Sequence, residues 1–234
     1  NKIDGERMFL INFNNNWQLI DKKLNIVKSG KSDMSMGWLI DGEWTNNKFM
    51  AFDMLYYKNQ CIMKKYLENR HKCLQKLIST TTLDFIEMKP FYYSNIFENA
   101  GILWENSDNL DGLIFTPLDE NYHYNMNTYK WKEHHTIDFL VKYNTVFVKN
   151  RHENVMFNIS PINITTCKNG GIYEFQFMGG EWKPIRERQD KIVPNALLTA
   201  KSVLKAHDEN ITIQELKNMG SVLDHNLIKF LMYY

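Results

Sequence analysis

The first half of the chain alternates short apolar runs with polar breaks, a pattern that is typical of β-strands joined by turns. The runs are rich in Ile, Leu, Phe and Trp, and Asn-rich breaks separate them at Asn14–Asn16 and Asn46–Asn47. Apolar runs of this length between turn residues predict strands of an antiparallel meander. We expect four such strands: Arg7–Phe13, Trp17–Asp21, Gly37–Trp44 and Phe49–Tyr57.

The next segment, Gln60–Ser79, has the periodicity of a helix. Its apolar residues recur at the spacing of one helix face, and Lys and Arg fill the opposite face. This basic face is either solvated or in contact with RNA phosphates, and the sequence leaves that choice open. Beyond it we expect a strand at Leu83–Met88, a helix at Ser94–Trp104 and a strand at Leu110–Pro117, which the proline ends.

After Lys132 the pattern changes to short strands at the intervals of a small β-barrel, with glycine pairs as turns. From Ala196 to the end the chain has a helical pattern. Thr212 is the predicted N-cap of the last helix, because Glu215 lies three residues further on, as in a capping box. The barrel strands are expected at Thr136–Tyr143, Thr145–Lys149, Asn154–Ile159 and Ile172–Met178.

Composition narrows the classes of protein that fit this pattern. The 234 residues allow one large or two modest domains, and a hydrophobic fraction of 44% supplies a core. With 28 basic and 27 acidic residues the net charge is +1, which excludes a polycation that coats nucleic acid by bulk charge. Cys61, Cys73 and Cys167 show no CxxC spacing, so we expect neither a disulfide framework nor a Cys-rich zinc site. No apolar run approaches the ~18 residues of a membrane span, and no membrane partner is expected.

Several short segments carry residue types that a packed core does not require. Lys2–Arg7 crowds a lysine, an acid and an arginine around Gly5, which permits close backbone approach. Leu39–Glu43 and Leu110–Phe115 pair apolar strands with acids. In an extended strand, Lys130 and Lys132 face the same way. This set of one nucleophilic lysine, several acids and many cations suits phosphoryl or nucleotidyl transfer.

The known phosphate-binding signatures of other enzymes are missing. There is no GxxxxGK[ST] loop and no protein-kinase signature set. A lysine amine can instead attack phosphorus itself when nearby cations and partial burial lower its pKa. Adjacent His134 and His135 would point to opposite faces of a strand and are poor metal co-ligands.

Six motifs occur in an order that resembles the covalent nucleotidyltransferase superfamily, and most of all its mRNA capping guanylyltransferases. The resemblance covers nearly the whole chain and is closest to the multifunctional capping enzymes of cytoplasmic DNA viruses or similar elements. The motifs are KxDGxR (Lys2–Arg7), the acid-ended strand at Asp41–Glu43, AFDML (Ala51–Leu55), DGLIF (Asp111–Phe115), KWK (Lys130–Lys132) and RxRxDKxxPN (Arg186–Asn195).

The resemblance implies an α+β fold in two domains. Residues 1–135 would form a nucleotidyltransferase domain of antiparallel sheets with helices, ATP-grasp-like, whose N-terminal part is missing because family members usually carry chain before the lysine. Residues 136–234 would form an oligonucleotide-binding (OB) β-barrel domain with a C-terminal helical extension. The boundary lies near Glu133–Thr136.

The resemblance also implies roles for individual residues. Lys2 matches the lysine that becomes guanylylated, Lys130 and Lys132 match α-phosphate contacts, and Arg186, Asp190 and Lys191 match OB-domain residues that orient pyrophosphate. Phe52 matches the ring that stacks on guanine and Lys89 the lysine that reads the base. Glu43 and Asp111 match acids near the ribose and the metal. The remaining nucleotide-binding positions are Asp4, Gly5, Arg7, Arg188 and Lys22, the last standing where the family commonly has arginine.

The activity implied is two-step mRNA guanylyltransfer with Mg²⁺ or Mn²⁺. GTP would guanylylate the lysine, and the 5′-diphosphate end of RNA would then accept GMP. Expected partners are RNA triphosphatase and cap methyltransferase domains or subunits, at a cytoplasmic site in preference to the nucleus. Two alternatives stay open: an ATP-dependent RNA or DNA ligase, and a catalytically inactive module that binds RNA 5′ ends.

Overall fold

The computed structural model describes residues 5–106, 110–123 and 128–219. They form two compact units, of which the first extends to Trp131 and takes up the chain again at Lys217, and the second is Lys132–Leu216. Each unit has its own core. None of the helices in these described ranges is long and apolar enough to cross a membrane.

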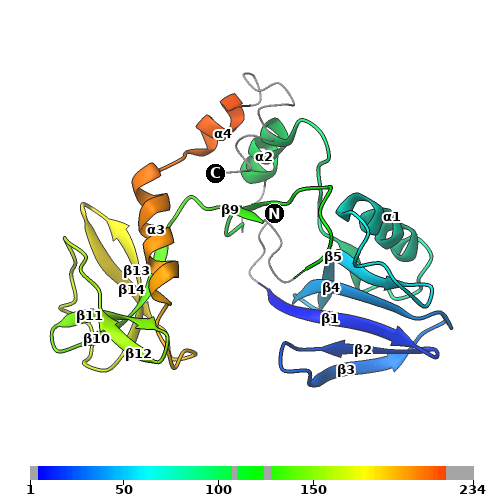
Figure 1. Cartoon of the computed structure of the whole chain (residues 1–234), viewed down its shortest axis with the longest axis horizontal. Helices are drawn as coiled ribbons and strands as arrows, with labels where there is room; N and C mark the ends of the chain where they lie inside the picture. Colours follow the sequence, from blue (N-terminus) through cyan, green and yellow to red (C-terminus); the bar gives the residue numbers. More distant parts are fainter. Residues whose placement is uncertain (1–4, 107–109, 124–127, 220–234) are drawn as a thin grey trace. The chain divides into compact units, whose positions relative to one another are not determined.

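The first unit is built on a seven-stranded sheet with the strand order β3-β2-β1-β4-β5-β6 and with β7 parallel to β5 (Figure 1). The four predicted strands are confirmed within a residue or so at each end. The connectivity is not a simple meander, because β4 returns to pair with β1. The strands are β1 (Glu6–Phe13), β2 (Asn16–Ile20), β3 (Ile26–Lys31), β4 (Trp38–Thr45), β5 (Lys48–Tyr57), β6 (Gln60–Cys61) and β7 (Ile86–Met88).

Strand β3 is absent from the sequence-based expectation, and its exposure explains why. Five of its six residues are exposed and only Gly30 is half-buried, so no apolar alternation marks this strand. By contrast, β1 alternates buried and partly exposed positions from Met8 to Asn12. Met8 and Leu10 enter a core that also includes Trp38, Ile40 and Phe49.

Helix α1 (Leu67–Ile78) packs against β5 and contributes Leu74 and Leu77 to this core. The helix begins later than the predicted Gln60, because Gln60–Cys61 pairs back onto β5 after a tight turn. Lys58 and Asn59 make that turn with φ of 50° and 60°. Helix α2 (Ile96–Glu105) follows, and then the two-stranded sheet of β8 (Leu113–Phe115) and β9 (Tyr129–Trp131).

The second unit is a five-stranded antiparallel sheet with the order β12-β11-β10-β13-β14 (Figure 1). In the described part of the chain β12 and β14 do not pair, so the sheet is open where a closed barrel was expected. Gly179 and Gly180 join β13 to β14 with φ of 61° and 85°, as a two-residue hairpin turn requires. The strands are β10 (Thr136–Lys142), β11 (Thr145–Asn150), β12 (Glu153–Met156), β13 (Ile172–Met178) and β14 (Glu181–Glu187).

Two helices follow this sheet, α3 (Leu197–Glu209) and α4 (Ile213–Met219). Ala200 of α3 is fully buried in a core that includes Ile137, Phe139 and Phe175. The predicted capping box of α4 is confirmed: Thr212 Oγ1 accepts from the Glu215 amide at 3.2 Å, and Glu215 Oε2 accepts from the Thr212 amide at 2.7 Å.

Candidate functional site

The pairing of β1 with β4 sets the first part of the site. Arg7 lies directly opposite Glu43 in the register, and Asp41 lies two residues before Glu43, so the three side chains share one face of the sheet. Gly42 turns to the core face, where an added Cβ would lie 2.5 Å from the ring of Phe49. The Asp-Gly-Glu sequence therefore meets a packing need on one face and presents two acids on the other.

Arg7 and Asp41 form a bidentate ion pair. Arg7 Nε donates to Asp41 Oδ1 at 3.0 Å and Nη2 donates to Oδ2 at 2.6 Å. The Asp41 side chain is fully buried, whereas 47% of the Arg7 side chain is exposed. Burial raises the pKa of Asp41, and the hydrogen bond from Arg7 opposes that rise. The same hydrogen bond raises the pKa of Arg7, which keeps a fixed positive charge at the surface.

A tyrosine from a distant part of the chain completes this pair. Tyr122 Oη donates to Asp41 Oδ2 at 2.8 Å and accepts from Arg7 Nη2 at 3.2 Å. Burial and the charge of Asp41 raise the pKa of the Tyr122 phenol above its ordinary value. The phenol thus stays protonated and serves as donor and acceptor at once.

The ring of Phe52 is placed by an irregularity in β5. Gly42 pairs with Ala51 and Asp41 pairs with Asp53, so Phe52 is the extra residue of a β-bulge. Bulges re-aim side chains and are frequent beside binding sites. Here two cations face the ring: the Arg7 guanidinium carbon is 5.8 Å from its centroid and Lys89 Nζ is 5.2 Å from it.

Lys89 follows β7, where its backbone amide donates to Ala51 O at 2.8 Å. Its side chain is 4% exposed, and Nζ donates to Glu43 Oε2 at 2.7 Å. A buried ammonium needs such a partner, and Glu43 supplies it. We call Arg7, Asp41, Glu43, Phe52, Lys89 and Tyr122 the sheet-face cluster.

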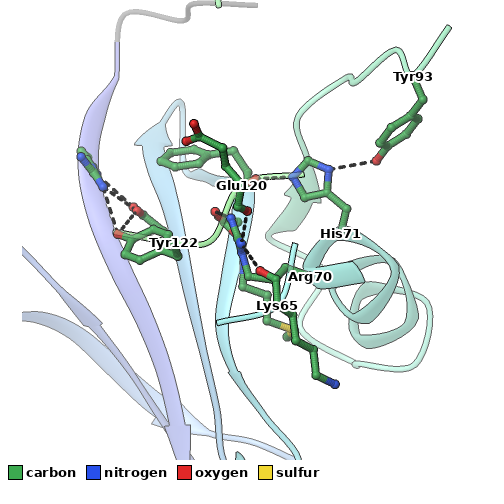
Figure 2. A network of polar contacts seen from close by, with 11 residues as sticks. Lys65, Arg70, His71, Tyr93, Glu120 and Tyr122 are labelled. Atoms are coloured by element: carbon green, nitrogen blue, oxygen red, sulfur yellow. Dashed lines mark hydrogen bonds and ion pairs between the residues drawn. The ribbon is translucent and has the colours of Figure 1, made fainter. Parts of the chain in front are cut away.

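Helix α1 supports the cluster through Arg70, which is fully buried (Figure 2). Arg70 Nε and Nη2 donate to the two carboxylate oxygens of Asp53 at 2.7 and 2.8 Å. Its Nη1 donates to the carbonyls of Lys65 at 2.5 Å and of Glu120 at 2.9 Å. The guanidinium therefore joins β5, the start of α1 and the segment that carries Tyr122.

His71, the next residue of α1, holds the backbone of Phe52. One ring nitrogen, Nε2, lies 2.8 Å from Phe52 O, and Nδ1 lies 3.0 Å from Tyr93 Oη (Figure 2). Because a carbonyl only accepts, Nε2 carries the proton and Nδ1 accepts from the tyrosine. Burial lowers the pKa of His71, so the imidazole is neutral at neutral pH.

Of the other predicted residues of the first unit, Gly5 borders the sheet-face cluster, and the rest of those described lie on other segments. Gly5 lies against β4, where an added Cβ would be 3.2 Å from Glu43 Cβ. Lys22 is exposed in the turn after β2, and Asp111 is exposed just before β8. Lys130 is exposed on β9 opposite Ile114. Lys2 and Asp4 lie outside the described residues, and half-buried Lys132 begins the second unit.

In the second unit the late motif forms a network of ion pairs around Asp138. Arg188 Nη1 donates to both Asp138 oxygens at 3.0 and 3.2 Å, and Lys191 Nζ donates to Oδ2. Arg188 also pairs with Asp190 at 2.8 Å, and Arg186 pairs with Glu174 at 2.5 Å. The hydrogen bond from Arg188 lowers the pKa of Asp190 to about 2. We call Asp138, Glu174, Arg186, Arg188, Asp190 and Lys191 the loop network.

The predicted acids suit a magnesium ion only if the phosphates of a bound nucleotide supply further ligands. Within the described residues, no three His, Cys, Asp or Glu side chains gather to hold a metal ion. Mg²⁺ commonly takes one or two carboxylates and completes its shell with phosphate and water oxygens. Glu43 and Asp111 are of the right chemical type for that arrangement.

Sequence reasoning misses several residues of the site. It notes Asp41 in its motif without assigning a role, and it does not single out Tyr122, His71 or Tyr93. Only Asp41 carries a sequence signal, namely its position two residues from Glu43 on a strand. The others join the site through contacts between segments far apart in the chain, which no local pattern reveals.

Comparison with known proteins finds a family model that matches part of the sequence and solved structures with a similar fold. Residues 118–217 match the family model described as the mRNA capping enzyme, C-terminal domain. The structure is similar to a mycobacterial DNA ligase D complexed with ATP and MES, with 14% identity and a TM-score of 0.52, over 81% of this chain and 88% of that one. The ligase domain of LigD from M. tuberculosis matches with 13% identity and a TM-score of 0.49, over the same shares of the two chains.

These findings agree with the expected fold class. The α+β architecture of antiparallel sheets with few helices is that of a ligase nucleotidyltransferase domain and OB-fold domain. The family match supports a relationship to capping enzymes over the later part of the chain.

Proposed function

We propose that this chain is the guanylyltransferase unit of an mRNA capping enzyme. The observation that carries the proposal is the platform at Phe52, an aromatic ring at a β-bulge with Lys89 and Arg7 over it and Glu43 beside it. An aromatic face accepts a nucleobase by stacking, and the surrounding charges supply hydrogen bonds to base and sugar.

The cation at this platform favours guanine over adenine. Guanine presents O6 and N7 as two acceptors, whereas adenine presents an amino donor in place of O6. The Lys89 ammonium has three N–H donors and no acceptor. One of them bonds Glu43, which leaves donors for a purine with two acceptors.

In the proposed first half-reaction, the neutral Lys2 amine attacks the α-phosphorus of GTP. The N–P bond forms, the bond to the bridging oxygen breaks, pyrophosphate leaves with the electron pair, and the lysine nitrogen gives up a proton to water. Lys130 and Lys132 balance the α-phosphate charge, and Arg186, Asp190 and Lys191 orient pyrophosphate. Mg²⁺ or Mn²⁺, held by Glu43 and Asp111, would add Lewis-acid stabilisation of the phosphate oxygens.

In the second half-reaction, a terminal oxygen of the RNA 5′-diphosphate attacks the same phosphorus. The N–P bond breaks, and the lysine nitrogen takes up a proton from water and leaves as an amine. An RNA triphosphatase must supply this diphosphate end, and a cap methyltransferase would use the product. We propose both as partner domains or subunits, at a cytoplasmic site of expression.

The test is covalent labelling of the protein with α-labelled GTP or ATP in the presence of Mg²⁺, followed by mass spectrometry of the adduct. We expect label from GTP on Lys2. Lys2→Arg should abolish it, because a guanidinium stays protonated and is a poor nucleophile. Lys201→Arg, on an exposed face of α3, is the matched control and should label normally.

Each alternative has its own outcome in this experiment. Label from ATP and none from GTP would assign the chain to the ligases, whose fold it shares. No label from either nucleotide would favour a binding module for RNA 5′ ends. Label that persists in Lys2→Arg would place the adduct on another residue.

A further inference from the structure

Tyr122 and Asp41 are the two members of the sheet-face cluster without a role in the proposed function. The Tyr122 hydroxyl closes a triangle with Arg7 and Asp41, in which Asp41 Oδ2 accepts from both other groups and Tyr122 Oη accepts from Arg7 Nη2. Among the described residues, Nη1 of Arg7 has no hydrogen-bond partner. The triangle therefore fixes one edge of the guanidinium and leaves the other edge for a ligand.

The segment that carries Tyr122 is anchored to the start of α1. The amide of Tyr122 donates to Met63 O at 2.8 Å, and the first amides of α1 donate to the same segment: Leu67 to Glu120 O at 3.0 Å and Glu68 to Leu118 O at 3.2 Å. These bonds satisfy amides that a helix leaves unpaired at its first turn. The segment is thus held by the backbone, and the position of the Tyr122 hydroxyl is set independently of Arg7.

These contacts form a closed circuit through the sheet. Asp41 pairs with Asp53 in the register of β4 and β5, Asp53 binds Arg70, and Arg70 binds Glu120 O two residues before Tyr122. Tyr122 then returns to Asp41 (Figure 2). This circuit of strand pairing, covalent chain and charge-assisted hydrogen bonds leaves the Tyr122 hydroxyl little freedom to move. The hydroxyl in turn restricts the guanidinium of Arg7.

We propose that Tyr122 is a positioning residue that fixes the Arg7 guanidinium for contact with the ribose of the bound nucleotide. This rests on the proposed function, in which the charges around Phe52, Arg7 among them, bond the base and the sugar. Arg7 is a long side chain that is half exposed and would otherwise lose rotamer freedom when it binds a ligand. Tyr122 orders it beforehand and so improves nucleotide binding without touching the reacting atoms.

The experiment compares adduct formation by the unsubstituted chain and Tyr122→Phe with GTP, 2′-deoxyGTP and 3′-deoxyGTP. Phe keeps the ring and removes only the hydroxyl. We expect the apparent KM for GTP to rise about five- to tenfold with less than a twofold change in maximal rate, since only binding geometry changes. The increase should shrink for the analogue that lacks the hydroxyl contacted by Arg7.

Two controls separate positioning from general support of the fold. Tyr92→Phe removes the hydroxyl of an exposed tyrosine in the segment between Lys89 and α2, and it should leave the KM values for all three nucleotides unchanged. In an Arg7→Lys background, Tyr122→Phe should add no further increase in KM, because residues that act as a unit are not additive. Urea midpoints of all variants establish that each one is folded.

The outcomes distinguish this inference from the function on which it rests. A labelled unsubstituted chain whose KM is unaffected by Tyr122→Phe, or affected equally for all three nucleotides, would overturn the positioning role alone. A chain that neither binds nor is labelled by GTP would overturn the proposed function and this inference with it.

Discussion

In the first unit Arg70 meets Asp53 in the protein interior, whereas in the second unit Arg188 meets Asp190 at the surface. The side chains of Arg70 and Asp53 are 0% and 3% exposed, and those of Arg188 and Asp190 are 16% and 65% exposed. Both arginines use two nitrogens on one carboxylate. The same chemistry is therefore present in two very different dielectric surroundings.

The difference in burial distinguishes an ion pair that the fold depends on from an ion pair whose partners can be exchanged. A buried pair cannot lose one partner without leaving an uncompensated charge in the interior, so Arg70 must stay with Asp53. A surface pair is worth little and its partners can be replaced by water or by another anion at small cost. The proposed role of the loop network in orienting pyrophosphate would use this ease of exchange, whereas the Arg70 pair links β5, which carries Phe52, to the Tyr122 segment.

The largest expected effect comes from breaking the buried pair. Arg70→Met keeps much of the length of the side chain but leaves Asp53 without its partner, and we expect a loss of about 3–5 kcal/mol in the free energy of unfolding. Urea denaturation measures it. Lys72→Met, which removes the exposed partner of Glu68 on the same helix, is the control, with about 0–1 kcal/mol. Equal losses in both variants would abolish the distinction between a buried and an exposed ion pair.

A substitution of Asp138, at the centre of the loop network, should lower the free energy of unfolding by less. Asp138→Asn keeps the shape of the side chain and its backbone bonds to Asn195, but weakens the bonds from Arg188 and Lys191. Both cations can turn to solvent, so we expect a loss of about 1–2 kcal/mol. A loss as large as that of Arg70→Met would show that the network resists exchange as strongly as the buried pair does.

A smaller effect concerns the pH dependence of the first unit. Burial lowers the pKa of His71 below its ordinary 6.5, so the unfolded chain binds this proton before the folded protein does. Stability should therefore fall as the pH decreases below 6.5, by at most about 1.4 kcal/mol per pH unit. Urea unfolding at pH 7.5 and 5.5 should show a smaller difference in His71→Gln. His152→Gln, at an exposed turn of the second unit, should keep the full difference.

The smallest effect is a titration rather than a change in stability. The hydrogen bond from Arg188 lowers the pKa of Asp190 to about 2. The stabilisation that this bond gives is therefore complete above the ordinary pKa of 3.8 and is lost as the pH falls through 2. Carboxyl NMR should follow the Asp190 pKa directly. In Arg188→Gln it should return toward 3.8, and in Lys183→Gln it should stay at about 2. An unchanged value in Arg188→Gln would assign the depression to another cause.

The sequence predicts the elements of the fold better than their arrangement. Short apolar runs between Asn-rich breaks predicted β1, β2, β4 and β5, because strands that enter a core collect apolar residues. The exposed β3 has no such pattern. The return of β4 to β1 could not be predicted from local periodicity, since that pairing depends on contacts between distant strands.

In the candidate site, too, the sequence predicts the residues that lie in local motifs and misses those that depend on contacts between distant segments. The motifs pointed to Arg7, Glu43, Phe52 and Lys89, which the structure brings together although their roles stay predictions. The places of Tyr122 and His71 in the site depend on how α1 and the segment from Leu118 to Tyr122 pack against the sheet. A single residue in a loop or helix carries no sequence pattern of its own. Lys2, on which the proposed chemistry depends, lies outside the described residues.

The bulge in β5 has a consequence for anyone who wishes to re-engineer nucleotide preference. The aim of the Phe52 ring is set by the number of residues between Ala51 and Asp53, and only secondarily by the choice of side chain. Exchanging the aromatic residue alters the stacking surface and leaves its direction intact. Deleting one residue there would straighten the strand and remove the proposed stacking platform. For the proposed specificity, the number of residues at this point therefore matters as much as their identity.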